Sequence, residues 1–223
     1  MKTKFSTKVI VEIAIFAAIA VALDFIQGAF FKGIWPNGGS LGIAMVPIFI
    51  ICYRRGLLPG LLCGLIVSIV QMLGGINSVQ GQTFDNDFLR AMGPFIQIML
   101  DYILAYTVVG FAGCFAGKYA KGKDIKTKLI WIIVGTLIGG LLKFLCHFLA
   151  GYFWLNMYND PMMGVDDTTM MFSFVYNGTY CIPNAIICTI IMVVIARFYP
   201  QLLEDNKEEV QEEIKEDETN EQN

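Results

Sequence analysis

Long runs of apolar residues, separated by short polar segments, extend over nearly the whole chain. Most runs reach the ~20 residues that an α-helix needs to cross a bilayer. The run at 41–52 is shorter, so it can cross only where neighbouring helices shield its end. The sequence therefore predicts an all-α integral membrane protein, a bundle of six transmembrane helices at residues 9–31, 41–52, 57–73, 91–117, 129–155 and 171–198.

The first run has a competing interpretation as a signal peptide. It follows a basic start with Lys2, Lys4 and Lys8, and Ala20–Ala22 offers a cleavage site. The apolar residues continue past this site instead of opening into a polar domain. We therefore interpret the run as the first transmembrane helix.

Composition agrees with a membrane protein and separates a polar tail from it. Of the 223 residues, 56% are hydrophobic and only 16% are charged, a balance typical of membrane proteins. The acidic residues are concentrated at the C-terminal end, from Glu204 onward. We expect a six-helix membrane domain at 1–200 and an acidic, disordered cytoplasmic tail at 201–223.

The distribution of basic residues predicts the orientation of the helices. Cytoplasmic loops of membrane proteins carry an excess of Lys and Arg. Arg54, Arg55 and the lysines of 118–128 fall on the same side as the N-terminus, whereas the other side has only Lys32 and Arg90. Both termini are therefore expected in the cytoplasm.

Two segments carry small residues at every fourth position. These are Ala14, Ala18 and Ala22 in the first run, and the glycines of 56–64 around the start of the third. Small residues at this spacing let another helix approach closely. That helix belongs either to the bundle itself, which is the simpler explanation, or to a partner.

Ionisable side chains within the apolar runs mark a candidate site. Lys143, the only histidine (His147) and Trp154 fall near one face of the fifth helix. Such residues are costly within a bilayer and mark functional sites. At 1.5 Å per residue, His147 lies about 27 Å along its helix, in the outer third, and Asp101 about 15 Å below the outer end of the fourth. Alternatively, Asp101 and Lys143 simply neutralise each other in the bundle.

The sixth run adds polar residues to the same outer half of the bundle. Ser173, Asn177, Tyr180 and Asn184 share one helical face. With Tyr102 and the charged residues above, they predict a pocket that opens to the outside. Carboxylates and aromatic walls suit a small, flat molecule, neutral or cationic.

No motif for catalysis is present. The chain contains neither H-E-x-x-H nor G-x-S-x-G, and without a Walker A sequence it should not hydrolyse ATP. The six cysteines form no C-x-x-C pair, and the single histidine argues against a metal site. We expect no enzymatic activity, cofactor or metal, and no nucleic-acid partner. The alternatives are a membrane enzyme in which Asp101 and His147 together act as the general base, and a purely structural membrane protein.

Short motifs that match a known family are spread over the chain from about residue 8 to 203. They are Glu12–Ala14 with Ala18 and Ala22, Gly38–Ser40, Pro47–Phe49, Arg54 with Gly56 and Gly60, Leu100–Tyr102, Leu142–Phe144 with His147, Gly151 and Trp154, and Tyr176, Asn177, Thr179 and Tyr180. In these motifs the chain resembles the thiamine-specific substrate-binding (S) components of energy-coupling-factor (ECF) vitamin transporters, the ThiT/YuaJ family.

The resemblance implies a function and partners. The chain would be a multi-pass protein of the cell membrane that captures thiamine outside and delivers it inward. A transmembrane coupling subunit (T component) would dock on Ala14, Ala18 and Ala22, and two ATPase subunits would supply the energy. The alternative is an S component for another vitamin or a thiamine precursor, because ligand choice lies in the site and not in the fold.

The resemblance also implies ligand contacts. The matching positions are Asp101, Tyr102, His147, Trp154, Phe172 and Asn177. Some relatives have Glu at the position of Asp101 and Tyr at that of Phe172. Asp101 would accept a hydrogen bond from the aminopyrimidine of thiamine. Trp154 and His147 would stack on its rings, and Asn177 would bond a polar edge.

Lys143 and Trp35 are the remaining candidates for the ligand site. A cation beside the cationic thiazolium repels it, so we expect Lys143 to pair with Asp101 or another acid. Trp35 lies beside a glycine-rich loop, 38–42, where some relatives have a Trp and a Glu as ligand contacts. Here Trp35 either caps the pocket or anchors the loop.

Overall fold

The computed structural model describes residues 6–31, 33–35, 38–80, 87–158 and 169–204, and the regular elements of this part are all helical. It contains five helical segments long and apolar enough to span a membrane: Thr7–Phe30, Leu57–Gly75, Ala91–Ala120, Ile125–Phe153 and Met170–Phe198. They correspond to the predicted first, third, fourth, fifth and sixth spans. The predicted all-α membrane class is confirmed.

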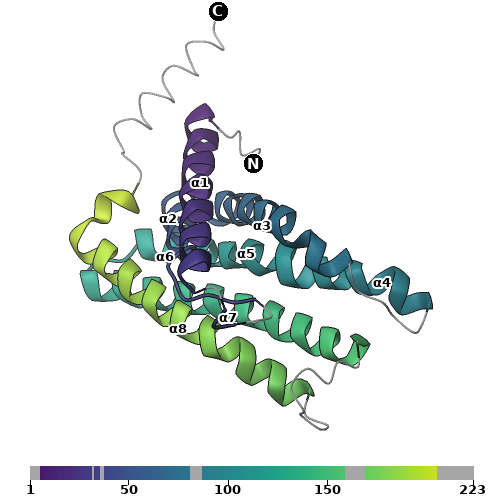
Figure 1. The fold of residues 1–223 in the computed structure, drawn as a ribbon. Coiled ribbons are helices and arrows are strands. Elements are labelled where there is room, and N and C mark those ends of the chain that lie inside the picture. Colours follow the sequence, from purple (N-terminus) through teal and green to yellow (C-terminus); the bar gives the residue numbers. More distant parts are fainter. Residues whose placement is uncertain (1–5, 32, 36–37, 81–86, 159–168, 205–223) are drawn as a thin grey trace, which may run out of the picture.

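The spans cross one another rather than forming one parallel bundle (Figure 1). α7 (Ile125–Tyr158) and α8 (Thr169–Phe198) pack side by side, and α1 (Thr7–Phe30) stands across the other helices. α3 (Leu57–Gln80) packs on α1 on one side and on the fourth span on the other. The main core lies where these elements surround α2 (Met45–Arg55).

α1 is one continuous helix that runs through the candidate cleavage site at Ala20–Ala22. Ile13, Ala17 and Ala20 are buried against the rest of the protein, so α1 is part of the folded bundle. The alanines of the four-residue repeat, in contrast, are exposed. Packing within the bundle, the simpler explanation of that repeat, is therefore wrong for this chain.

α2 is the short second segment, and it is the most deeply buried. Its residues from Met45 to Tyr53 are all buried, which explains why its sequence shows no polar face. The helix ends at Gly56, whose φ of +91° lies in the left-handed region that favours glycine. Arg54 and Arg55 belong to the last turn of α2.

Glycines bring α3 and the fourth span into backbone contact. The 3-10 helix η2 (Val108–Phe115) lies directly on the glycine face of 56–64. A Cβ on Gly64 would lie 2.3 Å from the carbonyl oxygen of Tyr106, and one on Gly110 would lie 2.5 Å from the amide nitrogen of Leu61. The prediction that this glycine face packs closely is confirmed.

The fourth span is not the single regular α-helix that its apolar run predicts. α4 (Asp87–Gln97) contains Pro94, which cannot donate a backbone hydrogen bond. A π-helix follows, η1 (Ile98–Leu104), and then the short α5 (Ala105–Thr107), η2 and α6 (Ala116–Ala120). π-helical turns are frequent at functional sites, and Asp101 lies in the middle of this one.

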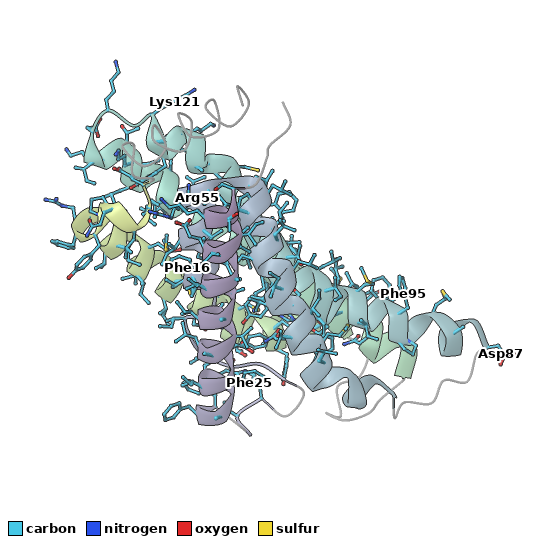
Figure 2. All side chains as sticks on the ribbon, turned by 90° about the horizontal axis from the view of Figure 1, so that it is seen from above. Phe16, Phe25, Arg55, Asp87, Phe95 and Lys121 are labelled. Atoms are coloured by element: carbon cyan, nitrogen blue, oxygen red, sulfur yellow. The ribbon has the colours of Figure 1, made fainter. Side chains whose placement is uncertain are left out.

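An ionic cluster joins α1 to α2 at one end of the molecule. Glu12 accepts hydrogen bonds from Nε of Arg54 at 3.2 Å and from Nε of Arg55 at 2.6 Å. Figure 2 shows Arg55 beside α1, and it places Lys121 and Asp87 at opposite ends of the molecule. The loop that carries Lys121 and the start of α4 at Asp87 are therefore far apart.

The lysine-rich segment at 118–128 contains a helix cap. Asp124 accepts hydrogen bonds from the amide of Thr127 at 2.8 Å and from its hydroxyl at 3.0 Å. These hydrogen bonds, the one from the Thr127 amide first, hold the pKa of Asp124 below its usual value. This cap explains why α7 begins at Ile125, four residues before the predicted start of the fifth helix.

The first residues of the predicted tail pack against the bundle. Arg54 donates to the carbonyl oxygens of Gln201 and Glu204 at 3.1 and 2.6 Å, and a short 3-10 helix, η3 (Pro200–Leu202), precedes the last contact. Residues 205–223, which make up the rest of the predicted tail, lie outside the described part of the chain.

Gly110→Ala should destabilise the protein, because the new methyl group would press against the backbone of α3. We expect a loss of about 1–3 kcal/mol of unfolding free energy, as for other overpacked sites. Gly117→Ala is the control, since a Cβ there meets no atom within 4 Å. Thermal unfolding in detergent compares the two variants. Equal melting temperatures would show that the contact with α3 does not limit stability.

Candidate functional site

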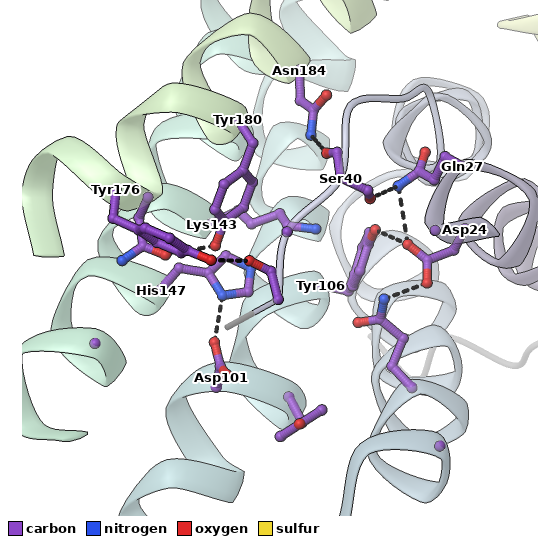
Figure 3. A pocket seen from close by; sticks show the side chains of 18 of the residues that line it. Asp24, Gln27, Ser40, Asp101, Tyr106, Lys143, His147, Tyr176, Tyr180 and Asn184 are labelled. Carbon is purple, nitrogen blue, oxygen red and sulfur yellow. Dashed lines mark hydrogen bonds and ion pairs between the residues drawn. The ribbon is translucent and has the colours of Figure 1, made fainter. Parts of the chain in front are cut away.

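A cavity of about 610 Å³ opens between α1, α3, η1, α7, α8 and the loop before α2 (Figure 3). This volume is in the range of small-molecule sites. Its wall is unusually polar for the interior of a helical membrane protein. The polar side chains that line it are Asp24, Gln27, Ser40, Gln71, Gln97, Asp101, Tyr102, Tyr106, Lys143, His147, Ser173, Tyr176, Asn177, Tyr180 and Asn184.

Asp101 and His147 form a close pair on one wall. Oδ1 of Asp101 lies 2.6 Å from Nδ1 of His147, and Gln97 donates Nε2 to Oδ2 at 3.3 Å. The side chain of Asp101 is 29% exposed and that of His147 is 13% exposed. An ionised carboxylate has about four acceptor positions, so Asp101 retains capacity for a hydrogen bond from a ligand.

The α8 wall is held by a chain of hydrogen bonds. Tyr180 donates its hydroxyl to Oδ1 of Asn177 at 2.6 Å, and Asn177 donates Nδ2 to the carbonyl oxygen of Ser173 at 2.9 Å. The hydroxyl of Ser173 donates to the carbonyl oxygen of Phe148 on α7 at 2.7 Å. The chain fixes the orientation of the Asn177 amide, as a preorganised binding group requires. The shared helical face predicted for these α8 residues is confirmed.

Lys143 lines the cavity, but its contacts are not those predicted. Its side chain is buried, and its Nζ lies 3.2 Å from the centroid of the Tyr106 ring. Among the described residues it forms no ion pair within 4 Å, and Asp101 is paired with His147 instead. The predicted pairing of Lys143 with Asp101 is therefore wrong. Lys143 and His147 lie one turn apart on the same face of α7, but the ammonium contacts Tyr106 whereas the imidazole contacts Asp101.

A second acidic group, Asp24 of α1, lies on the wall opposite Asp101 (Figure 3). Its Oδ1 accepts hydrogen bonds from the hydroxyl of Tyr106 at 2.7 Å and from Nε2 of Gln27 at 3.1 Å. Its Oδ2 accepts a hydrogen bond from Gln71 of α3. We did not predict Asp24 as a site residue. The signal was available, because an acid within a membrane span marks a functional site.

The loop before α2 closes one side of the cavity. Tyr176 donates its hydroxyl to the carbonyl oxygen of Gly38 at 3.0 Å. Asn184 donates to the carbonyl oxygen of Ser40 at 2.7 Å and accepts from the amide of Gly42 at 2.8 Å. Tyr176 and Asn184 of α8 therefore hold this loop in place. The sequence pattern predicts the helical face of such residues but not their contacts with the loop.

Trp35 anchors this loop rather than lining the cavity. Its indole N–H donates to the hydroxyl of Thr179 at 2.8 Å, and its ring meets the edge of Tyr180 with centroids 5.8 Å apart. It is absent from the cavity wall among the described side chains. Of the two roles predicted for Trp35, the structure supports the anchor.

The structure gathers most of the other predicted residues around the cavity. Tyr102 and Phe172 line it. The hydroxyl of Tyr102 donates to the carbonyl oxygen of Gly75 at 3.3 Å, and Phe172 stacks on Tyr176 with centroids 5.8 Å apart. Trp154 belongs to α7, but its side chain lies outside the described part of the structure.

A polar cavity lined by five membrane-spanning segments defines the class: an integral membrane protein that binds a small polar molecule. Comparisons with known proteins narrow this class. Residues 10–204 match the model of the family described as thiamine transporter protein (Thia_YuaJ). The chain belongs to this family. With five candidate spans among its described residues, it is a multi-pass protein of the cell membrane.

Two curated relatives and one solved structure agree with this assignment. The chain is 34% identical to the thiamine transporter ThiT of Bacillus subtilis, over 89% of this chain and 95% of the relative. It is 27% identical to ThiT of Lacticaseibacillus paracasei, over 87% and 89%. A structure of ThiT from Listeria monocytogenes has the same fold, with a TM-score of 0.65 at 24% identity, over 88% of this chain and 97% of that one.

Gly39→Ala should disturb the closed side of the cavity. Gly39 has a φ of +124°, and a Cβ there would lie 2.8 Å from the ring of Tyr180. Gly33→Ala is a matched control, because its φ is +92° but a Cβ meets nothing within 4 Å. Both variants strain the backbone, and only the first displaces Tyr180. We expect Gly39→Ala to melt at a lower temperature than Gly33→Ala, because overpacking costs about 1–3 kcal/mol of unfolding free energy. Equal melting would contradict the loop contact.

Proposed function

We propose that this chain is the thiamine-binding S component of an ECF-type transporter. It captures thiamine from outside the cell and releases it inward, with energy supplied by partner ATPases. The observation that carries the proposal is the cavity with Asp101 and His147 on its wall, in a chain whose relatives are named thiamine transporters.

The chemistry of the cavity suits thiamine. Thiamine joins a flat aminopyrimidine to a thiazolium ring with a permanent positive charge. The carboxylate of Asp101 accepts a hydrogen bond from the aminopyrimidine, and the amide of Asn177 bonds a polar edge of the ligand. His147 and Trp154 stack on its rings. The tyrosines of the wall add π-faces that stabilise a cation.

Phe172, Tyr102 and Tyr180 complete the proposed ligand site. Phe172 contributes an apolar surface without the hydroxyl that some relatives supply. Tyr180 orients Asn177 through the hydrogen bond between them. Trp35 acts indirectly, since it holds the loop that covers this side of the cavity.

The second candidate ligand is a precursor such as the pyrimidine half of thiamine, or another vitamin. Asp101, His147 and Asn177 can recognise a neutral aminopyrimidine without any thiazolium. Competition between thiamine and such fragments for the purified protein decides between them. We propose transport and not catalysis, and turnover of a bound ligand would contradict this.

Asp101→Asn should weaken thiamine binding at least ~10-fold, because a hydrogen bond to a charged acceptor contributes about 1.5–3 kcal/mol. Calorimetric titration of the detergent-purified protein measures the affinity. Asp124→Asn is the control, since Asp124 caps α7 at the far end of the protein from the cavity. An unchanged affinity in Asp101→Asn would remove Asp101 from the site. Absence of thiamine binding to the unaltered protein would reject the ligand.

The exposed alanines of α1 are the proposed docking surface for the T component. Ala14, Ala18 and Ala22 lie on the lipid-facing side, where small side chains allow a partner helix to approach closely. We expect Ala18→Trp to abolish thiamine uptake in cells that contain the coupling subunits, while binding to the purified variant persists. Ile190→Trp, exposed on α8 and not on α1, should transport normally. Loss of uptake in both variants would argue against a specific surface.

We propose that α2 and the loop before it form a sixth membrane segment, with both termini in the cytoplasm. Residues 1–200 then form the substrate-binding domain, and 201–223 form a cytoplasmic tail that binding does not need. A fluorescent reporter fused directly after Glu204 tests whether the C-terminus is cytoplasmic and whether the tail is dispensable. Such reporters become fluorescent only on the cytoplasmic side. Bright cells and full thiamine affinity are expected. Activity only of a reporter that requires export would place the C-terminus outside.

A further inference from the structure

The ammonium of Lys143 needs a compensating negative charge within the protein. Lys143 is buried, and a charged group without compensation is costly in a membrane interior. Asp101 does not supply the charge directly, because it is engaged by His147 and Gln97. The aromatic face that contacts Lys143 belongs to Tyr106, which is almost completely buried.

Tyr106 connects Lys143 to Asp24. The ring of Tyr106 receives the ammonium on its face, and its hydroxyl donates a 2.7 Å hydrogen bond to Oδ1 of Asp24. A hydrogen bond to a carboxylate increases the electron density of the phenol, and a cation is attracted to that density. The three groups therefore form a continuous sequence from cation to ring to anion.

We propose that Asp24 is the countercharge of Lys143, acting through Tyr106, and that this pairing makes the cavity selective for a monocation. The inference rests on the proposed function for its ligand, a cationic heterocycle, and it assigns a positioning role to a residue on α1. Asp24 does not need to touch the ligand. It offsets the positive charge of Lys143, which would otherwise repel the ligand.

The charges around the cavity support this assignment. Among the described lining residues, α1 contributes Asp24, η1 contributes Asp101, and α7 contributes Lys143 and His147. The described lining residues of α3, α8 and the loop before α2 are uncharged at neutral pH. With a neutral imidazole the wall carries two negative charges and one positive charge. The remaining charge of −1 matches one thiazolium.

The test compares thiamine with an isosteric analogue in which a neutral thiophene replaces the thiazolium. Asp24→Asn removes the charge but keeps an oxygen that can accept from Tyr106 and Gln27, and the Gln71 amide can rotate to accept from the new NH₂. We expect Asp24→Asn to weaken thiamine binding at least ~10-fold, because an uncompensated charge acts strongly at short range in a cavity of low dielectric. The neutral analogue should weaken much less. Asp24→Glu, which keeps the charge, should restore much of the thiamine affinity.

Lys143→Met supplies the second arm of the experiment. In the Asp24→Asn background it removes the uncompensated cation, so the double variant should bind thiamine more tightly than Asp24→Asn alone. The melting temperature gives a readout that needs no ligand. Lys143→Met should stabilise the Asp24→Asn protein and destabilise the unaltered one.

Three results would overturn the inference. The first is an equal loss of affinity for thiamine and for the neutral analogue in Asp24→Asn, which would mean that Asp24 only shapes the cavity through Gln27 and the loop. The second is unchanged affinity for both ligands. The third is additive effects of the two substitutions on melting. If the unaltered protein binds no thiamine, the proposed function fails, whereas the melting cycle still tests the pairing of Asp24 with Lys143.

Discussion

Every ionisable side chain within the membrane spans must find its partners inside the protein, because hydrocarbon offers none. This constraint organises the part of the structure around the cavity. Asp101 pairs with His147, Asp24 collects donors from three elements, and Lys143 lies on the face of Tyr106. The helices that carry these groups are thereby held around one polar cavity. Without those polar groups, nothing in the bundle would stabilise a polar cavity.

Close backbone packing makes this arrangement possible. Gly64 and Gly110 let α3 and the fourth span touch without intervening side chains. The fourth span departs from regular α geometry at η1, where an added residue per turn changes the direction of the side chains that follow. Tyr106 bonds to Asp24 of α1, while Asp101 pairs with His147 of α7. The fourth span therefore contacts both acidic groups of the cavity.

The periodicity of the chain predicts the helices, and depth along each helix predicts which residues meet. His147, Asp101 and Asn177 were placed in the outer half from their distance to the helix ends, and the structure brings all three to the cavity. The pairing of Lys143 was predicted wrongly, because sequence gives the depth of a side chain but not the rotation of its helix. The ammonium of Lys143 lies instead on the ring of Tyr106, which bonds to Asp24 of α1, a helix that crosses the others (Figure 1).

Thiamine capture in the cavity between Asp24 and Asp101 is the central claim, and a structure of the protein with thiamine bound tests it most directly. The account predicts the ligand inside the cavity, with its aminopyrimidine within hydrogen-bonding distance of Asp101 and a ring against His147. Its thiazolium should lie in the same cavity, near Asp24 and Lys143, whose charges offset each other. Thiamine bound at another surface, or a cavity that stays empty at saturating thiamine, would contradict the account.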